Sequence, residues 1–262
     1  MNTIINTNFL PILISGILVG AVAGYLGSLM LSRRMTIVVD PLSHLALPGV
    51  ALALLLGQDI SLGAFLFLFM GMLLIWFLET RTGLPTETVI AILFSVSLAI
   101  TFLFLSEEQI EKALLGDIAK IGFKQAIVIV SVCLIIFLIL QKIYQKLVLI
   151  NISEDLARTE GFHLKKYQLL YLLTIATMVA LSVKYVGGLL VAGLTVLPAA
   201  SARSLVRNLK MYQIFSFLLG ACSALLGICL FKITNLAAGP LIIISGLFFF
   251  IVSLIFKKIY EK

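Results

Sequence analysis

Two side chains with metal-binding chemistry, Asp40 and His44, lie four residues apart in an otherwise apolar stretch of the chain. On an α-helix, residues i and i+4 share one face, and their Cβ atoms lie about 5–6 Å apart. A carboxylate oxygen and an imidazole nitrogen at that spacing can reach one ion, and this mixed ligand set suits zinc, manganese or iron(II) better than magnesium or calcium. We therefore expect Asp40 and His44 to contact a divalent metal ion, with the hydroxyl of Ser43 nearby.

Other interpretations of this pair stay open on the residues alone. The two side chains could form a structural hydrogen bond, or Asp40 could pair with Arg33 or Arg34 near the lipid headgroups. Two ligands also leave a metal site incomplete. That incompleteness suits an ion in transit, because a complete tetrahedral or octahedral shell would trap it. Further ligands could come from water, from other helices or from a second copy of the chain.

The composition indicates the environment that surrounds these residues. Of the 262 residues, 61% are hydrophobic and 12% are charged, whereas soluble domains carry about 25% charged residues. So few charges cannot cover a water-facing surface, but a lipid-facing surface must itself be apolar. The chain is therefore predicted to be an all-α integral membrane protein in a lipid bilayer. The net charge of +7 does not indicate nucleic acid as a partner, because the basic residues lie in short loops between apolar runs.

Apolar runs long enough to span a bilayer recur along the chain. They lie at 9–31, 37–56, 60–79, 87–105, 124–149, 167–184, 186–205, 212–232 and 239–257. A spanning helix needs about 20 such residues, so we expect a bundle of eight or nine transmembrane helices that forms one domain over residues 1–262. Eight would result if either 167–184 or 186–205 is broken. The distribution of lysine and arginine places the N-terminus outside and the C-terminus in the cytoplasm, by the positive-inside rule.

Proline and glycine interrupt two of these runs. Pro48 and Gly49 follow the Asp–His pair, whereas Gly187, Gly188 and Pro198 punctuate the later stretch. Breaks at membrane depth free backbone groups, and they occur where those groups line a pathway or cavity. We expect these five residues to shape a pathway, although each could equally mark an ordinary helix kink.

One polar connection, residues 150–166, falls on the predicted cytoplasmic side. A short helix is expected from Ser153 to Thr159, because serine is a good N-cap, acidic residues occupy the first turn and Gly161 can end the helix. This segment could dock a cytoplasmic partner, or it could be a solvated connector.

The motifs of common enzymes are absent from the sequence. There is no Gly-x4-Gly-Lys-Ser/Thr loop to hold ATP, no zinc-protease motif and no Ser-His-Asp arrangement. Each of those motifs carries a specific chemistry that needs its residues at fixed spacing. The chain is therefore expected not to be an enzyme and to hold no permanently bound cofactor.

Two long motifs give the chain a family resemblance. The first is RRMTIVVDPLSHLALPGVALALLLG (33–57), which closely resembles the signature of the zinc/manganese-type ABC transporter permeases, the ABC-3 family. The second is VGGLLVAGLTVLPAASAR (186–203), which resembles another hallmark of that family. Weaker similarities are ISEDLARTEG (152–161) and TNLAAGP (234–240), and the order and spacing agree from about residue 9 to residue 256.

The resemblance implies a fold and partners that composition does not show. It implies a type II ABC importer-like permease that crosses a prokaryotic cell (inner) membrane several times. The chain is accordingly expected to act as a homodimer, with the pathway between its protomers. A cytoplasmic ABC ATPase dimer would drive it, and an extracytoplasmic metal-binding protein would deliver the metal.

The resemblance also implies roles for particular residues. In the family, the Asp and His of the D-x-x-x-H motif face the pathway and contact the metal, and those positions are Asp40 and His44 here. The cytoplasmic loop docks on the ATPase, and its residues here are Ser153, Glu154, Asp155, Leu156, Ala157, Arg158 and Gly161. The chain departs from the pattern at Pro41, where members more often carry a small or polar residue, so the start of the second helix is expected to be tilted.

These implications predict the membrane-spanning permease subunit of an ATP-driven importer of divalent metal ions that works by alternating access. Zinc or manganese is the favoured cargo, and ATP hydrolysis would take place in a separate chain. Three alternatives remain. The chain could be an ABC permease for iron or chelated iron, or a proton-coupled secondary metal transporter in which Asp40 and His44 relay protons. It could also be a membrane anchor whose Asp–His pair is structural.

Overall fold

The computed structural model describes residues 2–57, 60–106, 109–110, 118 and 121–260. Its helices are α1 (Asn2–Ser32), η1 (Thr36–Val38), α2 (Val39–His44), α3 (Leu47–Leu55), α4 (Ile60–Thr82), α5 (Thr86–Phe104), α7 (Phe123–Ile152), α8 (Glu154–Thr159), α9 (Leu164–Val186), η3 (Gly188–Leu190), α10 (Val191–Leu205), α11 (Leu209–Thr234) and α12 (Ala238–Tyr260). The prediction of an all-α membrane protein is confirmed.

The number of full-length spans differs from the prediction of eight or nine. Within the described ranges, seven helices are long and apolar enough to cross a membrane: Phe9–Ser32, Leu62–Thr82, Thr86–Phe104, Phe123–Ile152, Leu164–Val186, Leu209–Thr234 and Ala238–Lys258. The expected run 37–56 is divided into η1, α2 and α3, and α10 has only 15 residues. The seven long helices are therefore accompanied by two apolar segments that are short or broken.

Proline and glycine chemistry explains both departures. Pro48 lies in the first turn of α3, where a missing N–H removes no intrahelical bond, so proline favours a new helix start over the continuation of α2. Gly187 ends α9 with φ 81° and ψ 157°. Only glycine adopts that backbone region readily, and the chain changes direction there into η3 and α10.

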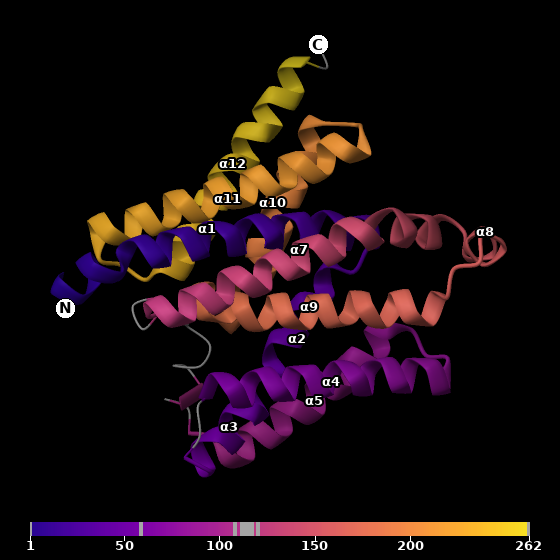
Figure 1. Ribbon diagram of the computed structural model, residues 1–262, viewed down its shortest axis with the longest axis horizontal. Helices are drawn as coiled ribbons and strands as arrows, with labels where there is room; N and C mark the ends of the chain where they lie inside the picture. The colour runs from indigo at the N-terminus through magenta and orange to yellow at the C-terminus, as the bar shows by residue number, and fades with distance from the viewer. Residues whose placement is uncertain (1, 58–59, 107–108, 111–117, 119–120, 261–262) are drawn as a thin grey trace.

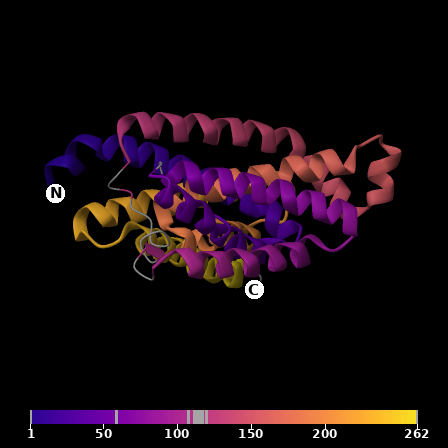
Figure 2. The ribbon, with the colours of Figure 1, turned by 90° about the horizontal axis from the view of Figure 1, so that it is seen from below.

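Most of the long helices run in a common direction, as Figures 1 and 2 show. The N-terminus lies at one end of this bundle and α8 lies at the opposite end. Hydrogen bonds fix which helix ends meet near α8. Asn151 donates to the carbonyl of Ser32 at 3.1 Å, and the Trp76 indole donates to the carbonyl of Lys165 at 3.1 Å. The ends of α1, α4 and α7 and the start of α9 are therefore on the α8 side.

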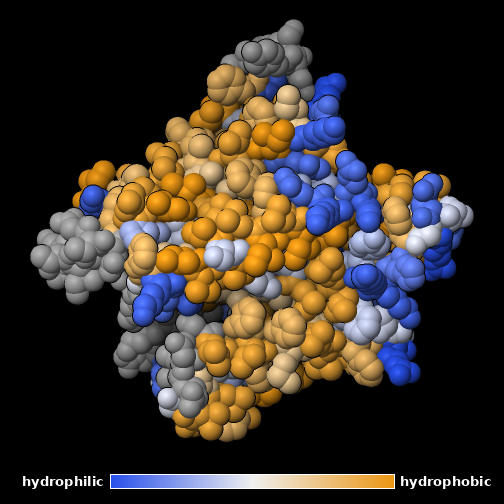
Figure 3. Space-filling model, in the orientation of Figure 1, coloured by the Kyte–Doolittle hydropathy of each residue, from blue (hydrophilic) through white to orange (hydrophobic). Residues whose placement is uncertain are grey.

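Hydrophilic residues gather at the α8 end, whereas apolar side chains cover the middle of the molecule (Figure 3). Basic residues on the helix ends and connections of this side are Arg33, Arg34, Arg81, Arg158, Lys165 and Lys166. Lipid-facing bands must be apolar, and cytoplasmic loops carry the excess of lysine and arginine. This distribution is the one that the positive-inside rule predicts if the α8 end faces the cytoplasm.

Close helix packing in the core depends on glycine. A Cβ on Gly20 of α1 would lie 2.5 Å from the carbonyl oxygen of Gly220 on α11 and 2.7 Å from the Cβ of Ala224. Small residues four apart allow helix backbones to approach in this way. The most deeply packed span is α1, whereas α4 and α5 leave most of their apolar surface uncovered in a single copy of the chain.

Candidate functional site

The Asp–His pair lies on α2, a helix of six residues in the interior of the bundle (Figure 1). Helix α2 contacts α5, α9, α10 and η3. Its buried side chains are Val39, Leu42 and Ser43, and Ser97 of α5 donates a hydrogen bond of 2.9 Å to the carbonyl oxygen of His44. A helix this short has little stability of its own, so these neighbours fix the orientation of the pair.

The two side chains differ in their surroundings. Asp40 is exposed and His44 is half-buried, and the Asp40 carboxylate acts electrostatically on the imidazole ring. The ring packs edge-on against Phe94, with centroids 5.4 Å apart. Its Nδ1 atom is buried and has no hydrogen-bond partner in the described part of the protein. A buried nitrogen without a partner is costly, and imidazole nitrogen is the commonest metal ligand in proteins.

Ser43 and Arg33 make other contacts. The Ser43 hydroxyl donates to the backbone carbonyl of Asp40 at 2.7 Å, so the structure directs it along its own helix. The Arg33 guanidinium donates to Gln168 at 3.0 Å and lies over the ring of Tyr171, 4.8 Å from its centroid. These contacts give Arg33 partners on α9 and do not favour the alternative in which it neutralises Asp40.

The candidate site offers two potential metal ligands, Asp40 and His44, from the described residues of one chain. No group of three or more His, Cys, Asp or Glu side chains among them could hold a metal ion together. Carboxylate oxygen and imidazole nitrogen suit first-row divalent ions. A two-ligand arrangement can contact an ion but leaves most of its coordination shell to water or to other groups.

The five predicted break residues fall into two groups. Gly187 and Gly188 lie at the α9–η3 junction, and η3 contacts α2, so this break adjoins the Asp–His pair. Pro48 is buried in the first turn of α3, and Gly49 packs against Gly63 of α4. Pro198 is buried inside α10 and lies beside α1. The glycine pair is thus close to α2 through a contact between elements, and Pro48 and Gly49 are close to His44 in the chain.

The short helix predicted from Ser153 to Thr159 is present as α8. The Ser153 hydroxyl accepts a hydrogen bond of 3.2 Å from the Leu156 amide, and Gly161, with φ 77°, follows the helix end. Asp155, Leu156 and Arg158 are exposed, whereas Ala157 is fully buried against the bundle. For Glu154 only the backbone is described. Helix α8 thus presents a mixed polar and apolar surface at the end of the molecule.

A polar network that the sequence does not predict lies near α8. Gln168 accepts from Arg33 and donates to Glu79 at 3.5 Å, and Glu79 also accepts from Thr86 at 2.9 Å. These residues join α1, α9, α4 and α5. One atom of each charged group, Nη1 of Arg33 and Oε2 of Glu79, is buried without a hydrogen-bond partner in the described ranges. The members are far apart in the chain, so no local pattern in the sequence groups them.

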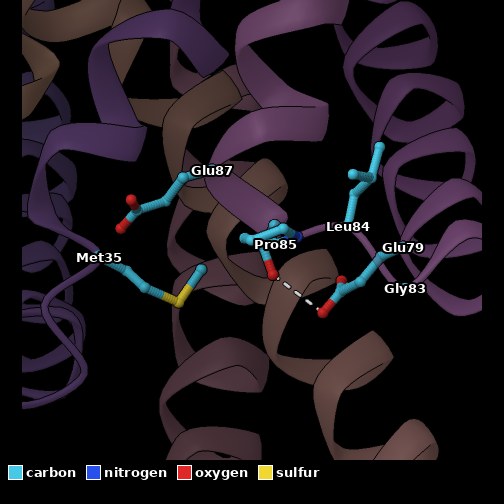
Figure 4. A pocket seen from close by; sticks show the side chains of 7 residues that line it. Met35, Glu79, Gly83, Leu84, Pro85 and Glu87 are labelled. Carbon is cyan, nitrogen blue, oxygen red and sulfur yellow. Dashed lines mark hydrogen bonds between the residues drawn. The ribbon is translucent and has the colours of Figure 1, made fainter.

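A cavity of about 540 Å³ adjoins this network at the turn between α4 and α5 (Figure 4). Its lining residues are Met35, Glu79, Gly83, Leu84, Pro85, Thr86 and Glu87. The hydrogen bond between Thr86 and Glu79 crosses the view in Figure 4, and the Glu87 side chain lies on the far side of Pro85 from Glu79. The carboxylates therefore do not converge on one point.

Comparisons with known proteins agree with this architecture. The model of the ABC 3 transport family matches residues 6–257. The manganese import system permease protein ScaB of Streptococcus parasanguinis is 28% identical over 245 residues, which are 92% of this chain and 88% of ScaB. The high-affinity zinc uptake system membrane protein ZnuB of Haemophilus influenzae is 30% identical over 254 residues, which are 95% of this chain and 97% of ZnuB.

A solved structure shares the fold. The structure of PsaBC from Streptococcus pneumoniae in complex with Fab superposes with a TM-score of 0.76 at 28% sequence identity. The similarity covers 96% of this chain and 94% of the compared chain.

Proposed function

The chain belongs to the ABC 3 transport family, and on this premise we propose that it is the membrane-spanning permease subunit of an ATP-driven importer of divalent metal ions. The observation that carries the proposal is the Asp40–His44 pair on α2, where the buried Nδ1 of His44 has no hydrogen-bond partner among the residues that the structure describes. The names of the relatives, a manganese import permease and a zinc uptake membrane protein, support a metal cargo.

The Asp–His pair is suited to hold the cargo briefly. The Asp40 carboxylate supplies negative charge, which favours a divalent ion, and the His44 imidazole favours first-row transition metals over calcium, magnesium and alkali ions. Because two side chains complete no coordination shell, the ion keeps part of its water and can leave. Zinc and manganese are both served by this ligand set, and an iron cargo is the alternative that the ligands themselves allow.

A second copy of the chain would form the other side of the pathway. Asp40 is exposed on a single copy, and an acidic side chain facing lipid near the middle of a membrane helix costs about 2.5–3.5 kcal/mol on insertion scales. A homodimer with the pathway between protomers removes that exposure to lipid. The uncovered apolar faces of α4 and α5 offer surface for such contacts.

Energy for transport would come from a separate cytoplasmic ABC ATPase, two copies of which would dock on the α8 loops at Ser153–Gly161. The exposed Leu156 is an apolar contact point on this polar helix. Displacement of α8 during ATP binding and hydrolysis would change the packing of the neighbouring helices, so that the site opens first to the outside and then to the cytoplasm. An extracytoplasmic metal-binding protein would deliver the ion.

The proposal is tested by metal uptake into proteoliposomes that contain the chain and its candidate ATPase. Zinc and manganese uptake is measured with and without ATP for the unmutated chain, for Asp40→Ala/His44→Ala and for the matched control Ser43→Ala. We expect ATP-dependent uptake that the double variant loses and the control retains, because the Ser43 hydroxyl is bonded within α2.

Two outcomes of that experiment would contradict the proposal in different ways. Uptake that needs no ATP and follows a pH gradient would identify a secondary transporter. ATP-dependent uptake that is equal in the double variant would leave the family membership intact and remove Asp40 and His44 from the site.

A further inference from the structure

Lys146, on the last part of α7, is enclosed by two aromatic side chains. Its Nζ donates a hydrogen bond of 2.9 Å to the hydroxyl of Tyr167. The same ammonium lies 5.0 Å from the centroid of the Tyr167 ring and 5.5 Å from that of Phe162. The two rings meet edge to face with centroids 5.9 Å apart. We call these three residues the Lys146 clamp.

The clamp holds the chain directly after α8. Gly161 turns the chain back with φ 77°, and the Phe162 amide donates to the carbonyl of Ala157 at 3.0 Å. Ala157 is fully buried in the core beneath α8. Helix α8 therefore has one anchor on its inner face and another, Phe162, at its C-terminal end.

The clamp also holds the start of α9. Tyr167 precedes Gln168, the residue that joins Arg33, directly after α1, to Glu79 of α4. One turn of α9 thus carries a contact to the α8 segment and contacts to two further helices. Helix α9 also packs against α2, which bears the Asp–His pair.

Physical considerations favour a mechanical role for this arrangement. A helix of six residues on a polar loop is too short to keep a fixed position by itself. Cation–π contacts and charge-assisted hydrogen bonds are strongest where water is partly excluded, and Lys146 is half-buried. Helix α8 touches both α7 and α9 directly, and a connection that does not bend adds to the force that these contacts transmit to α9.

We propose that the Lys146 clamp makes α8 and the start of α9 move as one body, so that a displacement of α8 by the ATPase is transmitted to the helix packed against the metal site. This inference rests on the proposed function, since it requires an ATPase that docks on α8. Lys146 is a positioning residue: it acts through Phe162 and Tyr167 and does not contact the cargo.

The test measures metal uptake and ATP hydrolysis in the same proteoliposomes containing the chain and its ATPase. The variants are Lys146→Met, the conservative Lys146→Arg and the matched control Lys142→Met, since Lys142 is exposed on the same helix. For Lys146→Met we expect ATP hydrolysis to persist while the metal transported per ATP falls by about 5- to 10-fold, as befits the loss of one partly desolvated cation–π contact with its hydrogen bond. Lys146→Arg should restore most of the ratio, and Lys142→Met should leave it unchanged.

The inference would be overturned if Lys146→Met transported as much metal per ATP as the unmutated chain. It would also be overturned if Lys146→Arg transported as little metal per ATP as Lys146→Met. If Lys146→Met fails to assemble with the ATPase, Tyr167→Phe takes its place, because it keeps the ring and removes only the hydroxyl that accepts the hydrogen bond. A ratio for Tyr167→Phe equal to that of the unmutated chain would then refute the clamp.

Amide hydrogen exchange separates failure of the clamp from failure of the proposed function. Loss of the clamp should speed exchange over residues 155–163 in Lys146→Met but not in Lys142→Met. Faster exchange, combined with no ATP-driven uptake by the unmutated chain, would overturn the proposed function and with it the transmission role. Unchanged exchange would overturn the clamp, whatever the transport result.

Discussion

Replacing Gly20 with alanine is expected to force α1 and α11 apart. The added Cβ would lie 2.5 Å from the carbonyl oxygen of Gly220 and 2.7 Å from the Cβ of Ala224, whereas carbon atoms pack at about 3.5–4.0 Å. The nearest obstacle is backbone, which cannot rotate away as a side chain can. Overpacking of a tight core costs about 1–3 kcal/mol, so we expect a destabilisation of about 3 kcal/mol for this variant.

Thermal unfolding of the purified chain in detergent measures this effect at a fixed scan rate. A change of 1 kcal/mol shifts the Tm of a 150–250-residue protein by about 2–4 °C, so Gly20→Ala should lower it by about 6–12 °C. The matched control is Gly71→Ala in α4, where the new Cβ would lie 3.7 Å from Leu45 Cδ1, an ordinary contact. The control should be neutral or slightly stabilising, because alanine favours helix over glycine by about 0.8–1 kcal/mol. Equal Tm values for the two variants would refute the packing argument.

Three further substitutions test the elements around the site. Gln168→Leu removes the bridge between Arg33 and Glu79, so the chain should lose about 1.5–3 kcal/mol of stability, the range for a hydrogen bond to a charged group; an unchanged Tm would show that the bridge is unimportant. Ser153→Ala removes the α8 cap, a loss of about 1 kcal/mol, and should speed amide exchange in α8 alone; equal exchange would contradict the cap. Gly187→Ala places a side chain at φ 81° and ψ 157°, a strain of about 1–3 kcal/mol that should lower the Tm and the uptake rate, and normal values of both would refute it.

The long spans follow directly from composition, but the broken ones do not. An apolar run of about 20 residues predicts a helix because lipid leaves its backbone no other hydrogen-bond partners. The same run cannot distinguish one continuous helix from two short ones when protein, rather than lipid, surrounds it. Residues 37–56 are such a case: Pro48 indicated a break, but the packing of the short α2 on α5, α9 and α10 could not be predicted from the sequence.

The candidate site is predictable in part from spacing. Asp40 and His44 are one helical turn apart, and the structure places both on α2. Spacing does not indicate that the Ser43 hydroxyl bonds to the backbone of its own helix. Nor does it indicate that Nδ1 of His44, beside Phe94, has no hydrogen-bond partner within the described ranges. The contact with Phe94 depends on α5, a helix that is distant from His44 in the chain.

Contacts between distant segments are the part that the sequence leaves undetermined. Arg33, Glu79 and Gln168 each look like an isolated polar residue at a membrane interface. Lys146 likewise resembles any other lysine near the end of a span, and only its position between Phe162 and Tyr167 distinguishes it from Lys142. A polar network joining four helices has no local signature, because its members share neither a helix nor a period.

The central claim, that metal passes through contact with the Asp–His pair, is tested most directly by ATP-driven uptake in the Asp40→Asn variant. This substitution keeps the shape of the side chain and removes its charge. Loss of even an outer partner of a metal ligand lowers metal affinity or activity by about 10- to 100-fold. We therefore predict that zinc and manganese uptake at low metal concentration falls by about 10-fold or more, while ATPase assembly and ATP hydrolysis are preserved. Uptake equal to that of the unmutated chain, at equal assembly, would show that Asp40 is not a contact of the transported ion.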